Sequence, residues 1–480
     1  MEAIYDEIKK RIDRQTAQPI YKQLADAVFY CVETGIIKSG DRLPPIRGLA
    51  SALNVNSVTV VNAYKVLENQ RVVYSITGSG FYVAEASNVE NETVAILPSF
   101  GKSTPIITPQ TVNFAKSSVS PELFPVDEFK EMFDRVLTRD KGSAFGYEQS
   151  LGFPALRESL CEYLDGFGIK TTGEKIQIIS GAQQGVDTVA KALLKPSDCV
   201  LTENPTYFGA VGAFMSRSAR VIGVDMENDG IDLNKLEMLV KLHRPKLLYV
   251  MTYFQTPTCV CYSIEKKRAL IELAAKYDFY IIEEDNQSDF IYSETQSVVP
   301  LKALDYKNRV IYIKSFSKLL MPGLKLGFAA LPKPVLNMVT NAKYTTDIDT
   351  SGFLQRAFDL FIETGGLQRH IKRMRSVFKP RCQTLISNAQ NKLTDYFSFE
   401  PPNGGLSVWL NAKENLKLSS TEICKIAADN GVAIMPGDVF TIHEKSMRGV
   451  RLSFADVDET GIKLGVDRLA EALSILSMQG

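Results

Sequence analysis

The chain has 480 residues, of which 45% are hydrophobic and 23% charged, so it can build more than one buried core. Its 55 Lys and Arg residues balance 55 Asp and Glu residues, which excludes a disordered, highly charged chain and binding driven by bulk positive charge. No apolar run approaches the roughly 20 residues of a membrane span, and the charged N-terminus lacks a secretory signal's apolar core, so we expect a cytoplasmic protein without a membrane partner.

The first part of the chain is predicted to be helical. Apolar residues recur at helical spacing over Pro19–Thr34, and a second helix is expected to begin at Pro45. After a tight turn, a third helix is expected to run to about Asn69, with Asn56 or Ser57 as its cap.

Two short strands are expected to follow these helices, at Arg71–Tyr74 and Gly80–Val83. Helices joined by a tight turn and followed by a two-stranded wing are typical of a winged helix-turn-helix domain. A helical dimerisation module that does not bind DNA is the alternative interpretation of this region.

DNA recognition requires short polar side chains at the start of the third helix, where it enters the major groove. An arginine at the start of the second helix can reach a phosphate or a guanine edge, and a wing glycine lets the backbone approach the DNA closely. The candidate DNA-binding residues are Arg47, Ser57, Thr59, Asn62, Lys65 and Gly80.

The string G-D-R-L-P-P-I-R-G-L-A-S-A-L-N-V-N-S-V-T-V-V-N-A-Y, with G-S-G-F-Y-V after it, closely resembles GntR-type winged-helix domains. The resemblance spans nearly all of residues 10–85 and implies a double-stranded DNA operator as partner. Residues 1–85 carry ten Lys and Arg against nine Asp and Glu. We therefore expect weak non-specific DNA binding, with recognition depending on paired half-sites in a dimer.

A change of composition separates this region from the rest of the chain. Residues 86–111 are rich in Ser, Thr, Asn and Pro and lack sustained periodicity, so they are interpreted as a linker with a short strand at Val94–Leu97. The predicted domains are therefore a reader at 1–85, this linker, and a large domain at 112–480.

The large domain is predicted to be α/β, because strand-like apolar segments alternate with helical ones. Ligands of such folds bind at the carboxyl ends of the strands. The predicted strands are Ile176–Ser180, Cys199–Glu203, Arg220–Asp225, Leu247–Thr252, Phe279–Glu284, Val310–Ser315 and Lys325–Ala330.

Cysteine and histidine chemistry is not expected at these strand ends. The seven cysteines are odd in number and scattered, and the three histidines form no cluster, so neither a disulfide framework nor a metal site is predicted. The close pair Cys259 and Cys261 is interpreted as structural.

The residues that follow the strands suit one cofactor, pyridoxal phosphate. Ser180–Gly185 opens a helix whose free N–H groups can bind a phosphate, and Tyr207 offers an aromatic plate. Glu283–Asn286 supplies acids, and Ser315–Lys318 ends in a lysine. An amine for the aldehyde, donors for the phosphate, an anion for the pyridine nitrogen and a planar partner are what this cofactor needs.

This part of the chain resembles fold-type I, class I aminotransferases over about 360 residues, most strongly in the motif S-F-S-K-x-x-x-P-x-x-K-x-G. The resemblance implies that Lys318 forms the internal aldimine. It also implies that Ser315 and Lys325 hold the phosphate together with the backbone of Ala182 and Gln183.

Three further roles are implied by the same resemblance. Tyr207 stacks on the cofactor ring, and Arg451, in G-V-R-L-S-F-A, grips a substrate or effector α-carboxylate with its planar fork. Tyr147 reaches the phosphate of a partner subunit.

The sequence departs from the family at four places. Thr256 stands where asparagine is usual and can hydrogen-bond the phenolic oxygen, while Asn286 stands where tyrosine is usual. Glu284 and Asp285 compete for the pyridine nitrogen, and because strand alternation lets only one face the site, we favour Glu284. Lys325 replaces an arginine. These changes predict a cofactor tuned away from efficient proton transfer.

A GntR-like reader joined to an aminotransferase-like body resembles the MocR subfamily of bacterial transcriptional regulators over the whole length. The resemblance implies a head-to-tail homodimer and a pyridoxal phosphate-dependent regulator. An amino-group effector, or pyridoxal phosphate itself, would be sensed through aldimine chemistry at Lys318.

Two other functions stay open. The chain could be an active aminotransferase with an accessory N-terminal domain, although the substituted asparagine, tyrosine and arginine positions favour sensing over turnover. It could also be a DNA-binding protein whose body binds no cofactor and serves dimerisation.

Overall fold

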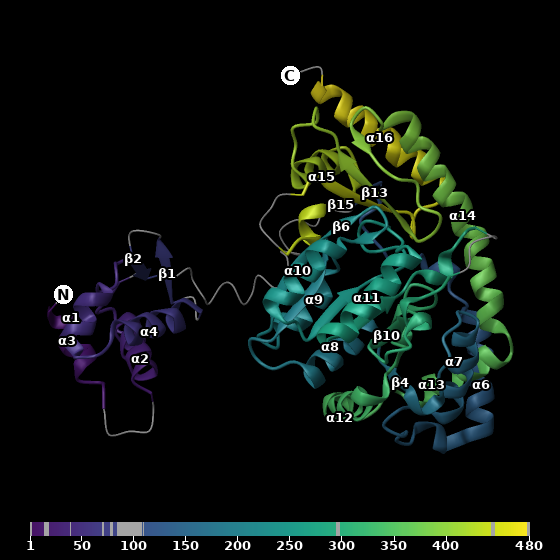
Figure 1. The fold of residues 1–480 in the computed structure, drawn as a ribbon. Coiled ribbons are helices and arrows are strands. Elements are labelled where there is room, and N and C mark those ends of the chain that lie inside the picture. The colour runs from purple at the N-terminus through teal and green to yellow at the C-terminus, as the bar shows by residue number, and fades with distance from the viewer. Residues whose placement is uncertain are drawn as a thin grey trace. The chain divides into compact units, whose positions relative to one another are not determined.

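The computed structural model describes residues 2–13, 19–38, 40–69, 72–76, 80–83, 108, 110–293, 298–442 and 447–477. The chain divides into two compact units, Met1–Leu97 and Pro98–Gly480 (Figure 1). The predicted boundaries at 85 and 112 stay predictions, and the strand predicted at Val94–Leu97 lies outside the described residues. Within the described residues, no helix is both long and apolar enough to span a bilayer.

The N-terminal unit contains the predicted helices and hairpin. Its elements are α1 (Glu2–Lys9), α2 (Ile20–Glu33), α3 (Ile46–Leu53), α4 (Ser57–Asn69), β1 (Val73–Ile76) and β2 (Gly80–Val83). The turn before α4 uses Asn54 in the left-handed conformation, with φ of 51°. Asn56 caps α4, because its Oδ1 accepts a hydrogen bond from the backbone N–H of Val58 at 2.9 Å.

Two expectations for this unit need correction. β1 begins at Val73 rather than Arg71, and pairs with β2 in register Val73 to Val83. Helix α1 was not predicted, although its Ile4 and Ile8 recur at helical spacing. Its Ile8 is buried with the apolar faces of α2, α3 and α4 in one hydrophobic core.

The C-terminal unit is built on a large sheet that was predicted to be mostly parallel; its central strands are parallel, and antiparallel pairing at both edges makes it mixed. Among the described residues it has eight strands, in the order β4-β11-β10-β9-β8-β5-β6-β7. β10 to β9, β9 to β8, β8 to β5 and β5 to β6 pair in parallel, and β11 and β7 pair antiparallel to their neighbours. The bounds are β4 (Ile176–Ile179), β5 (Cys199–Asn204), β6 (Arg220–Glu227), β7 (Gly230–Ile231), β8 (Leu247–Val250), β9 (Tyr280–Asp285), β10 (Val310–Ser315) and β11 (Gly327–Ala330).

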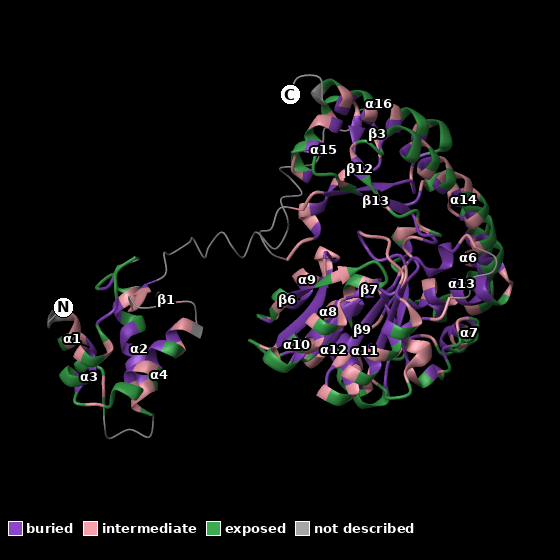
Figure 2. Cartoon of the chain, turned by 45° about the horizontal axis from the view of Figure 1, so that its top comes forward, coloured by how far each residue is buried: buried purple, intermediate pink, exposed green. Residues whose placement is uncertain are grey.

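Helices cover both faces of this sheet. Along β10, Ile311 and Ile313 join a core with α8 (Ala182–Leu193), α9 (Phe208–Met215) and α12 (Leu336–Asp347). The alternate residue Tyr312 faces the core of α6 (Val126–Asp140), α7 (Pro154–Asp165) and α13 (Gly352–Glu363), and Val310 the core of α10 (Leu233–His243) and α11 (Ile264–Tyr277). Figure 2 shows the strands as buried and the outer helix faces as exposed.

A smaller sheet, which was not predicted, completes this unit. It has the order β12-β13-β16-β15 and lies with α14 (Gly366–Lys392), α15 (Ser420–Asp429) and α16 (Glu459–Ser477). Its strands are β12 (Phe397–Ser398), β13 (Ser407–Ala412), β15 (Met435–Pro436) and β16 (Gly449–Ser453), and nearby β3 (Val112–Asn113) pairs with β14 (Val432–Ala433).

Candidate functional site

A cavity of about 720 Å³ lies at the carboxyl ends of the large sheet's strands, with residues of the smaller sheet on its other side. Its lining comes from the stretches 113–118, 180–183, 207–208, 284–286, 315–325 and 434–440, together with Thr256 and Arg451. The strand ends therefore converge with the C-terminal part of the chain on one site, as expected for an α/β fold.

An anion-binding helix terminus forms one end of the cavity. Helix α8 begins after Gly181, whose φ of 99° is a conformation that suits glycine. No side chain caps this helix, so the first N–H groups, those of Ala182 and Gln183, have no partner within it. Both residues line the cavity. Such a terminus attracts a phosphate through free donors and the helix dipole.

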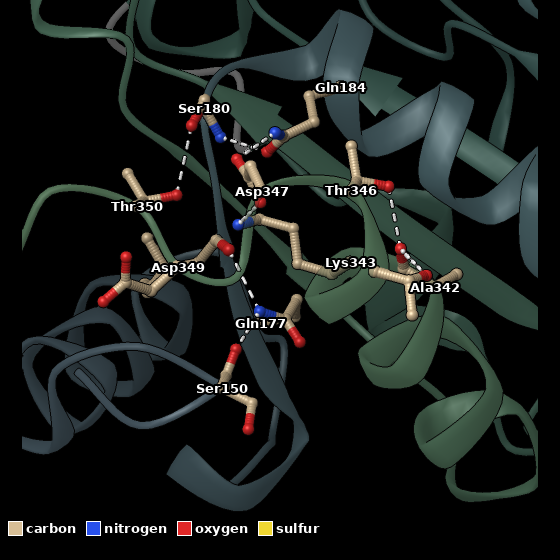
Figure 3. A network of polar contacts seen from close by, with 12 residues as sticks. Ser150, Gln177, Ser180, Gln184, Ala342, Lys343, Thr346, Asp347, Asp349 and Thr350 are labelled. Atoms are coloured by element: carbon tan, nitrogen blue, oxygen red, sulfur yellow. Dashed lines mark hydrogen bonds and ion pairs between the residues drawn. The ribbon is translucent and has the colours of Figure 1, made fainter. Parts of the chain in front are cut away.

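A polar network holds this terminus in place (Figure 3). The backbone N–H of Ser180 donates to Oε1 of Gln184 at 2.7 Å, and the Ser180 hydroxyl contacts the hydroxyl of Thr350 at 3.1 Å. Nε2 of Gln184 donates to Asp347, which also pairs with Lys343 at the end of α12. The terminus is thus fixed before any ligand binds.

Further donors come from the segment between β10 and β11. Oγ of Ser315 donates to Oγ of Ser317 at 3.0 Å, and both serines line the cavity. Lys325 also lines the cavity. Its backbone is in the left-handed conformation, with φ of 50°, directly after the short helix η6 (Pro322–Leu324). The predicted strand Lys325–Ala330 therefore starts late, at Gly327.

Glycine is required at position 327 for a steric reason. A Cβ there would lie 2.6 Å from the carbonyl oxygen of Lys314, closer than nonbonded atoms approach. The close passage of β11 against β10 keeps Lys325 beside the cavity, in the same region as Ser315.

Lys318 is the central nucleophile candidate. Its side chain lines the cavity, and within the described residues its Nζ has no hydrogen-bond or ion-pair partner. Burial, with a smaller contribution from the positive charge of Arg451, lowers the pKa of Lys318 to about 8, and Glu284 opposes this. The neutral, nucleophilic form of the amine is therefore far more abundant near neutral pH than in an ordinary lysine.

Glu284 and Asp285 have different surroundings, as alternation along β9 requires. Glu284 lines the cavity and accepts hydrogen bonds from the Tyr249 hydroxyl at 2.7 Å and from Nδ2 of Asn286 at 3.0 Å. Burial raises the pKa of Glu284. Asp285 instead accepts from the Tyr312 hydroxyl at 2.6 Å and pairs with Lys314 at 3.2 Å. Burial acts to raise the pKa of Asp285, but these partners lower it overall.

Tyr207 and Thr256 lie on neighbouring loops that share a buried carboxylate. Glu203, at the end of β5, accepts hydrogen bonds from Nε2 of Gln255 at 3.0 Å and from the Tyr262 hydroxyl at 2.7 Å. Burial raises the pKa of Glu203 to about 8. Because Glu203 and Gln255 join the two loops, they hold Tyr207 and Thr256 on the cavity wall.

Arg451, on β16, supplies a buried cation to the cavity wall. Its side chain is 6% exposed, and its Nη2 donates to the carbonyl oxygen of Ala115 at 2.9 Å. Burial lowers the pKa of Arg451 to about 10, so it stays charged at neutral pH. Its Nε has no acceptor, and no carboxylate of the described residues pairs with it. A buried cation without a counterion is costly and favours an anionic ligand.

Comparison with known proteins agrees with both units. Residues 112–469 match the family of aminotransferases class I and II, and residues 20–83 match the bacterial regulatory proteins of the gntR family. Over nearly its whole length the chain is 25% identical to the probable rhizopine catabolism regulatory protein MocR of Rhizobium meliloti, with 98% of this chain and 97% of the relative covered. The chain belongs to the MocR subfamily of GntR-type regulators, within the aminotransferase class I and II family.

Other relatives of this MocR-type chain divide into regulators and enzymes. It is 26% identical to the HTH-type transcriptional regulator YisV of Bacillus subtilis, covering 97% and 98% of the two chains. It is 30% identical to aromatic-amino-acid aminotransferase 1 of Thermococcus litoralis, covering 76% and 88%. The solved multiple substrate aminotransferase of Thermococcus profundus superposes with a TM-score of 0.73 at 29% identity, covering 82% and 96%.

Pyridoxal phosphate is the cofactor of this family, and the cavity fits it. The uncapped start of α8 and Lys325 suit the phosphate, and the unpaired amine of Lys318 suits the aldehyde. The buried carboxylate of Glu284 suits the pyridine nitrogen, and the ring of Tyr207 offers a plate.

The cavity gathers nearly all the residues predicted for cofactor and effector. Those on its wall are Lys318, Ser315, Lys325, Ala182, Gln183, Tyr207, Thr256, Glu284, Asn286 and Arg451. Tyr147 is not on the described wall; its side chain is 85% exposed. Its contact with a partner subunit stays a prediction, as do the roles of the others.

The predicted DNA-binding residues lie on α3, α4 and β2 of the MocR-type chain's first unit. Arg47, Ser57, Asn62 and Lys65 are exposed, and Thr59 and Gly80 are half-buried. Their contacts with DNA stay predictions.

Several cavity residues were not predicted. Ser317 lies within the S-F-S-K motif, which was the available signal. Phe440 ends the short helix η8 (Gly437–Phe440) and Lys116 lies in a loop, and no local pattern pointed to either residue. In the first unit, Val58 is 61% exposed in the first turn of α4, where an apolar side chain suits a thymine methyl group.

Proposed function

We propose that this MocR-type regulator senses a small amino-group effector in the cavity of its C-terminal unit and changes its affinity for an operator in response. The observation that carries the proposal is that one cavity holds two cationic groups with no carboxylate partner among the described residues. Lys318 presents an amine whose pKa is lowered to about 8, and Arg451 presents a buried guanidinium whose Nε lacks an acceptor. An α-amino acid brings the amine and carboxylate that suit these two positions.

The residues of the cavity have distinct proposed tasks. Bound pyridoxal phosphate would supply an aldehyde that exchanges between the Lys318 amine and the effector's amine. The start of α8, Ser315 and Lys325 would hold the phosphate, and Glu284 would keep the pyridine nitrogen protonated. Thr256 would hydrogen-bond the phenolic oxygen. When displaced, Lys318 would take up or release a proton at its free Nζ.

The N-terminal unit is proposed to bind a double-stranded operator through α4, with Arg47 and Lys65 near phosphates or guanine edges. Its nearly balanced charge supports weak non-specific binding, so paired half-sites and a head-to-tail homodimer are part of the proposal. An effector changes the output only if it binds two domain arrangements with different free energies. The operator implies a cytoplasmic site of action.

Turnover of amino acids is the second candidate function, supported by the 30% identity to an aminotransferase. The replacements at Thr256, Asn286 and Lys325 favour sensing, because each alters a group that holds or polarises the cofactor. A test must therefore separate binding from product formation.

The experiment uses the purified full chain with added pyridoxal phosphate. Visible absorbance should develop, shift on adding an amino-acid effector, and accompany a change in operator affinity. Lys318→Ala should abolish the absorbance and the response, whereas Lys333→Ala, an exposed lysine outside the cavity, should leave both intact. A colourless chain, or an effector-saturated chain with unchanged operator affinity, would overturn the proposal. Formation of keto acid in large molar excess over the protein would favour an active aminotransferase instead.

A further inference from the structure

The wall of the cavity beside Arg451 is apolar, and the strand register explains why. Met435 on β15 lies directly opposite Arg451 on β16 in the antiparallel pair. Directly opposed residues share one face of a sheet, so the two side chains are neighbours. Ile434 and Val439 continue the same wall.

Aromatic rings extend this wall across the cavity. The guanidinium carbon of Arg451 lies 5.4 Å from the ring centre of Phe440. That ring lies 6.4 Å from Phe208, which lies 5.0 Å from Tyr207. The rings thus form a row from the cofactor-stacking position to the carboxylate-binding position. A ligand between Lys318 and Arg451 would lie along this row.

Each cation of the described cavity lining already has a partner or a proposed role, so none is left to bind a charged side chain of the ligand. Among the described lining residues they are Lys116, Lys318, Lys325 and Arg451. Lys116 already pairs with Asp456 at 2.8 Å. The proposed function uses the other three for the α-carboxylate, the aldehyde and the phosphate. A second carboxylate on the ligand would be buried without a counterion, which is costly.

We infer that Met435, Val439, Phe440 and Phe208 form a side-chain subsite, and that the effector is an α-amino acid with a large apolar side chain, aliphatic or aromatic. The inference rests on the proposed function, because it places the effector between Lys318 and Arg451. Acidic amino acids are disfavoured, because no cation of the described lining residues is left for a second carboxylate, and glycine or alanine leaves the apolar wall uncovered. A single extra or missing methylene in an apolar pocket already changes discrimination by roughly ten- to two-hundred-fold.

The test is calorimetric titration of the cofactor-loaded full chain with L-leucine, L-phenylalanine, L-alanine and L-glutamate. Leucine or phenylalanine should bind at least about tenfold more tightly than alanine and glutamate. Tighter binding of glutamate or alanine would overturn the subsite and leave the proposed sensing intact. If none of the four amino acids gave a binding signal while visible absorbance was present, both the subsite and the proposed sensing would be overturned.

The second measurement asks whether a cation added to the apolar wall shifts binding from leucine towards glutamate. Val439→Lys adds a cation to the half-buried wall without touching Lys318 or Arg451, and should weaken leucine about tenfold while strengthening glutamate by a similar factor. Leu464→Ala, an exposed apolar residue on α16, is the matched control and should change neither. An unchanged leucine-to-glutamate ratio in V439K, with retained absorbance and thermal stability, would also overturn the subsite.

Discussion

The guanidinium of Arg451 is bound to the main chain of a distant segment, because its Nη2 donates to the carbonyl oxygen of Ala115 at 2.9 Å. That segment is itself ordered, since Oδ1 of Asn113 accepts hydrogen bonds from the backbone N–H groups of Ala115 and Lys116. In sequence it directly follows residues 86–111, the predicted linker. A carboxylate on Arg451 would therefore act on residues continuous with the reader.

Effector binding should change hydrogen exchange in residues 112–119. A carboxylate that recruits Arg451 alters the bond to Ala115, so exchange of this peptide should change while that of α6 (Val126–Asp140) does not. Mass spectrometry of the loaded full chain, with and without effector, measures this. Identical exchange at saturation would contradict the coupling.

Arg451→Gln should weaken effector binding by about two orders of magnitude, because removing one partner of a buried charge pair costs about 2–5 kcal/mol. Visible absorbance from the attached cofactor should persist. Arg451→Lys should restore affinity only in part, since a point charge cannot reach Ala115 and hold a carboxylate bidentately. Calorimetry checks both variants, and full affinity in R451Q would contradict the assignment.

Lys318 and Lys325 should have separable effects on the cofactor. Lys318→Ala should remove covalent attachment and the visible absorbance. Lys325→Ala should keep the absorbance but weaken cofactor affinity roughly 10- to 100-fold, as expected for a charged hydrogen bond of about 1.5–3 kcal/mol. Equilibrium titration monitored by absorbance and fluorescence distinguishes the two. An unaltered affinity in K325A would exclude it from the phosphate site.

Cofactor attachment to the unloaded chain should accelerate with pH and level off above about 8, the lowered pKa of Lys318. Only the neutral amine attacks, and it accumulates as the pH rises through that value. Because the charge of Arg451 lowers this pKa and that of Glu284 raises it, Arg451→Gln should move the midpoint upward and Glu284→Gln downward. Stopped-flow absorbance across pH measures the midpoints. Shifts of the same sign would refute this electrostatic account.

Two substitutions in the reader should separate affinity from specificity. Arg47→Ala should weaken binding to all DNA and reduce the salt slope by about one, if it contacts a phosphate. Asn62→Ala should cost about 1–3 kcal/mol on a selected operator only, if it reads a base. Fluorescence anisotropy at several salt concentrations measures both, with the exposed Ser51→Ala as control. Equal losses on operator and random DNA in N62A would exclude base recognition.

The large sheet was predictable because its strands are apolar segments bounded by turn residues, and Val310–Ser315 was predicted with the bounds that it has. The smaller sheet was not. Its β12 (Phe397–Ser398) and β15 (Met435–Pro436) are two residues long, too short to carry a period. Their pairing depends on tertiary contacts that no local pattern contains.

The same distinction applies to the site. Lys318 follows a regular strand and Glu284 lies near the end of one, so they were found by looking for ligand-binding residues at the carboxyl ends of strands. The alternation of side chains along a strand then separated Glu284 from Asp285. Phe440 and Ala115 reach Arg451 only through the register of β15 and β16 and the folding of residues 113–118. The contact of Arg451 with Ala115 joins parts of the chain more than 300 residues apart, which pattern analysis cannot connect.

The apolar core of the first unit contains residues between 4 and 83 and shares none with the cores around the large sheet. Substitutions that retarget α4 to a new operator therefore need no compensating change in the packing around the effector cavity. Under the proposed function, mutation would alter the recognised operator and the bound effector separately, and a recombinant exchange of readers between relatives would produce new pairings of signal and promoter.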